Sequence, residues 1–140
     1  MQRLEVVQEY ALPVERVYAY LSEHETLGPL LGARITRVSD GATSRNGAGS
    51  ARRLKVGPLP AFVETVTAAV PDERIEYRIT SGVTPVRDHR GELVFASTPG
   101  GSRVTWTIEL GAVVPLLDRV LALALERNVR AGLARVGALA

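Results

Sequence analysis

The chain has 140 residues, 46% of them hydrophobic, and a net charge of +2. That length buries one substantial core, so the sequence predicts a single domain over residues 1–140. The absence of cysteine excludes disulfides and a cysteine nucleophile, and the cytoplasm is the expected location. Basic residues are interleaved with acidic ones, and their longest run is Arg52-Arg53, so nucleic-acid binding is not predicted.

The first third of the chain predicts a strand, two short helices and a second strand. Residues 3–10 alternate between apolar and polar, which is typical of a strand with one wet face. Pro13 begins a short helix, and residues 25–32 predict a further helical turn that Gly28 and Pro29 interrupt. Extended structure resumes with "ARITRV" at 33–38, and the polar, glycine-rich segment after it predicts a hairpin loop.

The rest of the chain predicts antiparallel strands followed by one long helix. The strands are expected at residues 50–56, 61–69, 74–81, 88–97 and 102–110. From Val113 to about Val136, apolar residues return at three- and four-residue steps, which indicates an amphipathic helix. Charged residues interrupt its apolar run, so it is not predicted to span a membrane. An antiparallel sheet with one apolar face needs a cover, and this helix is long enough to provide it.

Several segments resemble the START/polyketide cyclase (SRPBCC) superfamily. They are "LPVERVYAYLSEHE", "GSARRL", "VETVTAAVPDERIEYRI", "PVRDHRGEL" and "GSRVTWTIEL". The resemblance implies an α+β helix-grip fold, in which a curved seven-stranded antiparallel sheet wraps around a long C-terminal helix, with two short helices after the first strand. The sequence departs from many relatives at Tyr18, where they carry Trp or Phe, and at His89, where they carry Tyr.

The resemblance also implies an internal cavity for a small hydrophobic or amphipathic molecule between the sheet and the C-terminal helix. Strand alternation then identifies the side chains that face this cavity. The predicted ligand-binding residues are Arg52, Leu54, Glu64, Val66, Tyr77, Ile79, His89, Leu93, Phe95, Trp106 and Ile108 from the strands, with Leu121 and Leu125 from the helix.

Arg52 and Glu64 are charged residues on the inward parity of two neighbouring strands. A lone buried charge is unfavourable, so two inward charges are expected to pair or to meet a polar ligand. In a second interpretation, a bulge near Gly57 or Pro60 turns them outward as a solvated pair. In a third interpretation they form a buried structural pair that contacts no ligand.

The candidate acid–base residues are His89, Glu64 and Tyr77, with Glu64 as the carboxylate that would orient the histidine. His24, near the end of the first helix, is expected at the surface. Two histidines far apart and no cysteine give no metal-ligand spacing, so neither a metal nor a cofactor is predicted.

Two segments are candidate gates, namely residues 22–32 and the loop at 81–87, with ordinary connecting loops as the alternative. Three arginines of the last helix, Arg127, Arg130 and Arg135, could contact acidic lipid headgroups, although a solvated helix face explains them equally well. Such contact would be transient.

Three functions remain open at this point. The favoured one is binding, as sequestration or transfer, of a small hydrophobic or amphipathic molecule. The first alternative is a cofactor-free enzyme similar to polyketide cyclases and aromatases, and the second is a surface module for a protein partner. The sequence is compatible with a monomer or a homodimer.

Overall fold

The computed structural model describes residues 1–82 and 84–139 and has the elements expected of a helix-grip protein. Ten elements follow one another along the chain. They are β1 (Gln2–Tyr10), α1 (Val14–Ser22), α2 (His24–Leu31), β2 (Arg34–Ser39), β3 (Ala51–Lys55), β4 (Phe62–Val70), β5 (Arg74–Gly82), β6 (Val86–Thr98), β7 (Gly101–Ala112) and α3 (Leu117–Leu139).

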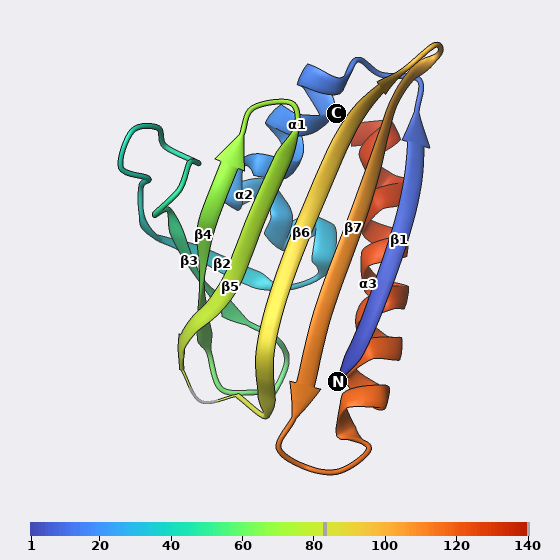
Figure 1. The fold of residues 1–140 in the computed structure, drawn as a ribbon. Helices are drawn as coiled ribbons and strands as arrows, with labels where there is room; N and C mark the ends of the chain where they lie inside the picture. Colours follow the sequence, from blue (N-terminus) through green and yellow to red (C-terminus); the bar gives the residue numbers. More distant parts are fainter. Residues whose placement is uncertain (83, 140) are drawn as a thin grey trace.

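The strands form one antiparallel sheet of seven strands in the order β1-β7-β6-β5-β4-β3-β2. The sheet is curved, and all three helices lie on its inner face (Figure 1). The helix α3 lies behind β1 and β7, and α1 and α2 lie behind the strands nearer the other edge of the sheet. The predicted fold class is therefore confirmed. No helix of the described residues is long and apolar enough to cross a membrane.

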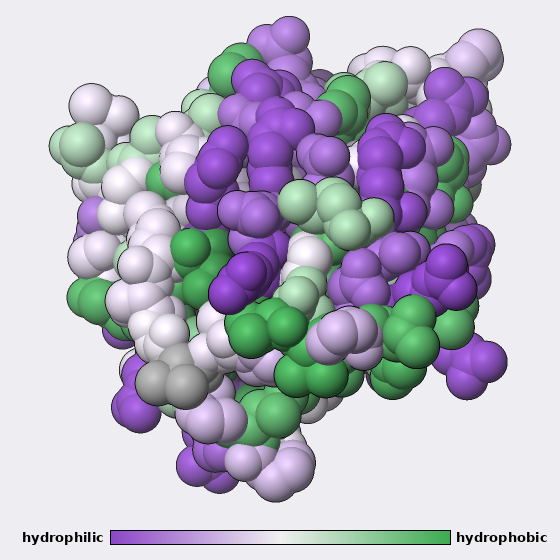
Figure 2. Space-filling view, turned by 60° about the horizontal axis from the view of Figure 1, so that its bottom comes forward, coloured by the Kyte–Doolittle hydropathy of each residue, from purple (hydrophilic) through white to green (hydrophobic). Residues whose placement is uncertain are grey.

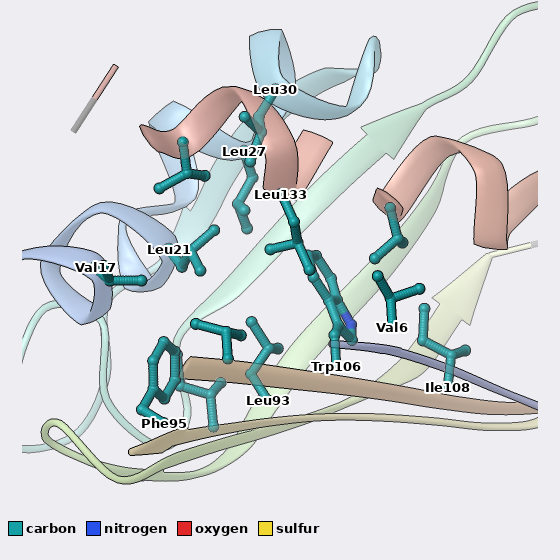
Figure 3. Packing of buried hydrophobic residues seen from close by; sticks show 14 of the residues in the cluster. Val6, Val17, Leu21, Leu27, Leu30, Leu93, Phe95, Trp106, Ile108 and Leu133 are labelled. Atoms are coloured by element: carbon teal, nitrogen blue, oxygen red, sulfur yellow. The ribbon is translucent and has the colours of Figure 1, made fainter. Parts of the chain in front are cut away.

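The core lies between the inner face of the sheet and the three helices. Val104, Leu110 and Leu133 are fully buried, and the close view shows sheet residues such as Leu93 and Phe95 pointing toward Leu21 and Val17 of α1 (Figure 3). Alternation along each strand places these side chains on a single face. The sheet, α1, α2 and α3 therefore share one apolar core.

The long helix begins later than its apolar pattern predicts. Residues 113–116 lie outside α3, and Leu116 adopts a positive φ of 68°. Pro115 restricts the residue before it to extended conformations, which disfavours helix at Val114. Val113, Leu116 and Val120, predicted to face the core, are 54%, 68% and 62% exposed, so that part of the helix prediction is wrong. The connection between β7 and α3 lies at the lower end of the molecule in Figure 1, and Figure 2, which turns that end forward, shows apolar groups gathered at the surface there.

The second short helix is continuous through Gly28 and Pro29, which were expected to interrupt it. Pro29 is the sixth residue of an eight-residue helix, and Gly32 ends the helix in the left-handed region with φ of 69°. Gly28 packs closely against the backbone of Ala33. A larger side chain at position 28 would meet that backbone, so this glycine keeps α2 close to β2.

Candidate functional site

Arg52 and Glu64 form a buried ion pair on the inner face of the sheet. They lie directly opposite each other in β3 and β4, and their side chains are 7% and 10% exposed. Arg52 Nε and Nη2 lie 3.1 and 3.0 Å from Glu64 Oε1. The interpretation in which a bulge turns this pair to the outer surface is therefore wrong. Because both contacts use one carboxylate oxygen, the second oxygen is left to other partners.

The Arg52–Glu64 pair is the start of a polar centre that Tyr77 and Trp106 extend into the core. The Arg52 guanidinium lies 5.1 Å from the Tyr77 ring centroid, a cation–π distance, and Trp106 Nε1 donates a hydrogen bond of 3.0 Å to the Tyr77 hydroxyl. Burial, and then the Glu64 charge, raise the pKa of Tyr77. Tyr77 therefore keeps its proton, and because its oxygen accepts from Trp106, that proton can be donated elsewhere.

Gly91 on β6 makes room for the Tyr77 ring. A Cβ at position 91 would overlap the outer end of that ring, and residue 91 pairs with Tyr77 across β5 and β6. The glycine is needed here for space rather than for backbone conformation. Strand alternation contains no signal for this contact, and the sequence prediction missed it.

His89 is held as a neutral hydrogen-bond donor. The amide of Ile79 donates to His89 Nδ1 at 3.2 Å, so the neutral ring carries its proton on Nε2. Nε2 lies 3.8 Å from Glu64 Oε2. Burial lowers the pKa of His89 in spite of the opposing effect of Glu64, and Arg52 lowers it further. Glu64 and His89 are therefore neighbours, but their side chains are too far apart for a hydrogen bond.

A small cavity of about 10 Å³ lies beside this centre. Such a volume corresponds to about one water molecule. Of the predicted ligand-binding residues, those that line it are Arg52, Val66, Tyr77, Leu93 and Trp106. The remaining lining residues were not predicted to bind a ligand, although Ser22 and Leu27 belong to the first candidate gate; they are Leu21, Ser22, Leu27, Asn46 and Ile75. No described residue of α3 lines it, so the cavity lies against α1, α2 and the β2–β3 loop (residues 40–50).

The other predicted ligand-binding residues lie outside this lining. Phe95 packs edge-on against Tyr18 with ring centroids 5.0 Å apart, and Ile108 is buried in the general core. The rest are Leu54, Glu64, Ile79, His89, Leu121 and Leu125, of which Leu121 and Leu125 pack half-buried against the core. Leu54 and Glu64 are buried and Ile79 is half-buried, so other parts of the protein fill the space around them.

His24 lies in the core, so its predicted surface position is wrong. The side chain is fully buried, and its Nε2 contacts Ser50 Oγ at 3.1 Å. Ser50 Oγ donates its proton to the Gly47 carbonyl, so it accepts the His24 Nε2 proton, and His24 Nδ1 has no partner among the described residues. Burial lowers the pKa of His24 to about 4, with Arg52 and Arg37 as further causes.

Arg37 joins the β2–β3 loop to the helices. Its guanidinium donates to Glu25 at 2.7 Å, to Glu23 at 2.9 Å and to the Asn46 side-chain oxygen at 2.6 Å. Asn46 in turn donates to Glu23 at 3.2 Å. The hydrogen bond between Arg37 and Glu25 is the main cause that lowers the pKa of Glu25 and raises the pKa of Arg37. A half-buried charged cluster therefore fixes the loop above the cavity.

The remaining predictions concern the arginines of the last helix, the two candidate gates and metal ligands. Arg135 donates to the Leu30 carbonyl and Arg130 pairs with Glu126, so these two arginines have partners within the chain. Residues 24–31 of the first candidate gate form α2. The second gate, at 81–87, includes Val83, which is outside the described residues. Within the described parts of the chain, no three His, Asp or Glu side chains are grouped as metal ligands.

The comparisons with known proteins agree with this architecture. A family described as "Polyketide cyclase / dehydrase and lipid transport" matches residues 1–140. The solved ZhuI aromatase/cyclase from Streptomyces sp. R1128 is 17% identical, with a TM-score of 0.80 over 98% of this chain and 92% of that one. The protein TTHA0849 from Thermus thermophilus is 20% identical, with a TM-score of 0.78 over 97% and 94%.

Ara h 8.0201 is a further structural neighbour, 14% identical, with a TM-score of 0.71 over 99% of this chain and 96% of that one. At these identities the likeness concerns the fold. Comparison with curated protein sequences gives no match.

Proposed function

Since this chain belongs to the polyketide cyclase/dehydrase and lipid transport family, we propose that it binds a small, largely apolar molecule carrying an oxygen acceptor. The observation that carries the proposal is Arg52, a buried cation that lines a mostly apolar cavity. Its Nε and Nη2 both contact Glu64, so the ion pair does not use Nη1. A guanidinium beside a mostly apolar cavity, with a nitrogen that its ion pair does not use, can donate to a ligand oxygen.

The neighbouring polar groups support the same ligand chemistry. Tyr77 has a hydroxyl proton to donate, and His89 presents an Nε2 proton rather than a lone pair. A centre rich in donors suits a carbonyl, carboxylate or phenolate oxygen. The apolar part of the ligand would contact Val66, Leu93 and the helix residues opposite them.

Binding is better supported than cyclase chemistry. A general base needs a free lone pair within hydrogen-bond reach of its substrate, whereas His89 Nδ1 already accepts from the backbone, and neither His89 nor Glu64 lines the cavity. With a volume of about 10 Å³, the cavity must enlarge before a ligand enters. Proteins commonly bind in a minor open state that the ligand then populates.

The test is binding of the anionic apolar dye anilinonaphthalene sulfonate to wild type, Arg52→Gln and Arg53→Gln. Arg53 is the neighbouring exposed arginine on the opposite face of β3 and is the matched control. We expect Arg52→Gln to weaken binding roughly tenfold or more, because a hydrogen bond to a charged group contributes about 1.5–3 kcal/mol. Arg53→Gln should bind as wild type does.

The double variant Arg52→Gln/Glu64→Gln controls for folding, because it removes both charges and leaves no unpaired carboxylate. It should melt nearer to wild type than Arg52→Gln does and still bind weakly. Equal binding by Arg52→Gln and wild type would refute the proposal. Failure of the dye to bind any of the proteins would favour the function at a protein-partner surface.

A further inference from the structure

An open cleft of about 650 Å³ lies on the surface directly beside the buried cavity. It is bounded by α1, the β2–β3 loop and the β4–β5 turn, with Tyr18 and Ala69 among its apolar walls. Ser22 and Asn46 line both the cleft and the buried cavity. These two side chains are thus where the interior comes nearest to this cleft.

Asn46 is fixed at this boundary by the charged cluster. Arg37 donates to its side-chain oxygen at 2.6 Å, and its nitrogen donates to Glu23 at 3.2 Å. Arg45 of the same loop contacts Glu23 and Glu25 at 3.1 and 3.2 Å. The contacts therefore hold the loop to the α1–α2 junction through a few side-chain bonds that can break together.

The loop is otherwise held mainly by its own backbone. The amide of Gly41 bonds to the carbonyl of Arg45, that of Ala42 to Ala48, and that of Gly47 to Ser44. Gly49, where the loop meets β3, has φ of 93°, a conformation that glycine adopts easily. Movement of residues 41–48 as a compact unit would break the bonds from the Ser50 amide and hydroxyl to the Gly47 carbonyl, but no strand-to-strand hydrogen bond. In Figure 1 this loop extends from the sheet beyond β3 and β4, at the side opposite β1.

The opposite end of the sheet lacks such a connection. None of the described residues in the β3–β4 and β5–β6 connections lines the buried cavity. A route from that end would have to pass the His89 side chain, which accepts a hydrogen bond from the backbone amide of Ile79.

We infer that the ligand enters between Ser22 and Asn46, and that the β2–β3 loop is a gate closed by Arg37. The inference rests on the proposed binding function and adds the place of entry and the residues that select what passes. The hydroxyl of Ser22 and the amide of Asn46 are the first interior groups a ligand would meet. Opening requires that Arg37 release Asn46 together with Glu23 and Glu25.

The test uses the absence of native cysteine and needs no ligand. Val66→Cys places one thiol in the lining of the buried cavity, and Val104→Cys places one at a fully buried position outside it. Each is combined with Arg37→Gln or with the control Arg103→Gln, which removes an exposed ion pair to Glu9 on the outer face. The rate of reaction with the aromatic disulfide DTNB is measured below the unfolding transition.

We expect Arg37→Gln to speed labelling at position 66 about tenfold or more, because it removes charged hydrogen bonds from the closed state alone. Labelling at position 104 should stay within about twofold, and Arg103→Gln should change neither rate. High salt should also speed labelling at position 66, because it screens the ion pairs that hold the loop.

An unchanged rate at position 66 would overturn the inference, as would an equal acceleration at position 104, which indicates global opening. These outcomes are separate from those of the dye experiment. Gated labelling without dye binding would leave the entrance in place and refute the ligand chemistry proposed for Arg52.

Discussion

The unfolding free energy should depend on pH through His24, a fully buried histidine. Its Nε2 proton is used by Ser50, and Nδ1 has no partner among the described residues. A proton added at Nδ1 would therefore create a cation inside the core with no acceptor. Burial is the main cause that lowers the pKa of His24 to about 4, and the charge of Arg52 contributes next.

The size of the effect follows from the difference in pKa between the two states. The pKa falls from 6.5 in the unfolded chain to about 4 in the folded protein. At about 1.4 kcal/mol per pKa unit, this corresponds to about 3 kcal/mol. Because the unfolded state binds the proton first, the contribution is complete above about pH 6.5. It is lost as the pH falls toward 4, and below that it changes no further.

The assay is urea unfolding of wild type and His24→Gln between pH 7 and pH 4. Glutamine keeps an N–H that can donate to Ser50 but does not titrate. The carboxylates and His89 are common to both proteins, so they cancel in the difference. We expect wild type to lose about 3 kcal/mol more than His24→Gln over this range. A pH-independent difference, or a His24 pKa near 6.5 by NMR titration, would refute the reasoning.

Three further predictions concern the core. Gly91→Ala should displace Tyr77 and lower the unfolding free energy by roughly 1–3 kcal/mol. The fluorescence of the single tryptophan should shift because its hydrogen bond to Tyr77 breaks. Unchanged fluorescence and melting would argue against this packing. Tyr10→Phe removes a buried 2.6 Å hydrogen bond to the Leu133 carbonyl and should lower the unfolding free energy by about 1–2 kcal/mol in urea. Leu133→Ala should lower the unfolding free energy by about 3 kcal/mol or more, measured by thermal unfolding. The control Leu123→Ala, at a position that is 62% exposed, should change it little. Similar losses in both variants would contradict the burial pattern.

Strand alternation predicted most of the buried inner-face residues of the sheet, although Ile79 is only half-buried. It favoured inward positions for Arg52 and Glu64, because every second side chain of a strand shares one face. The structure, in which the two residues form a buried pair across β3 and β4, removes the outward alternative. Helical spacing was less informative for α3. The pattern from Val113 to Val120 has the helical period, but Pro115 and the left-handed Leu116 delay the helix, and these residues stay exposed.

The candidate site was predicted only in part because its lining comes from distant segments. Tyr77 and Trp106 could be named from strand parity, but Asn46 lies in a polar loop where no periodicity applies. His24 illustrates the same limit, since its burial depends on Ser50, 26 positions later in the chain. Space for Tyr77 likewise depends on the missing side chain of Gly91 on a neighbouring strand.

The sequence by itself determined the order of the elements, because that order follows from local periodicity, and the resemblance to a known family implied the helix-grip fold. The tertiary structure alone decided how far side chains fill the interior, which tautomer His89 adopts and where the cavity approaches the surface. Those properties depend on atoms brought within a few ångströms of each other from separate elements, and close packing makes them sensitive to single side chains.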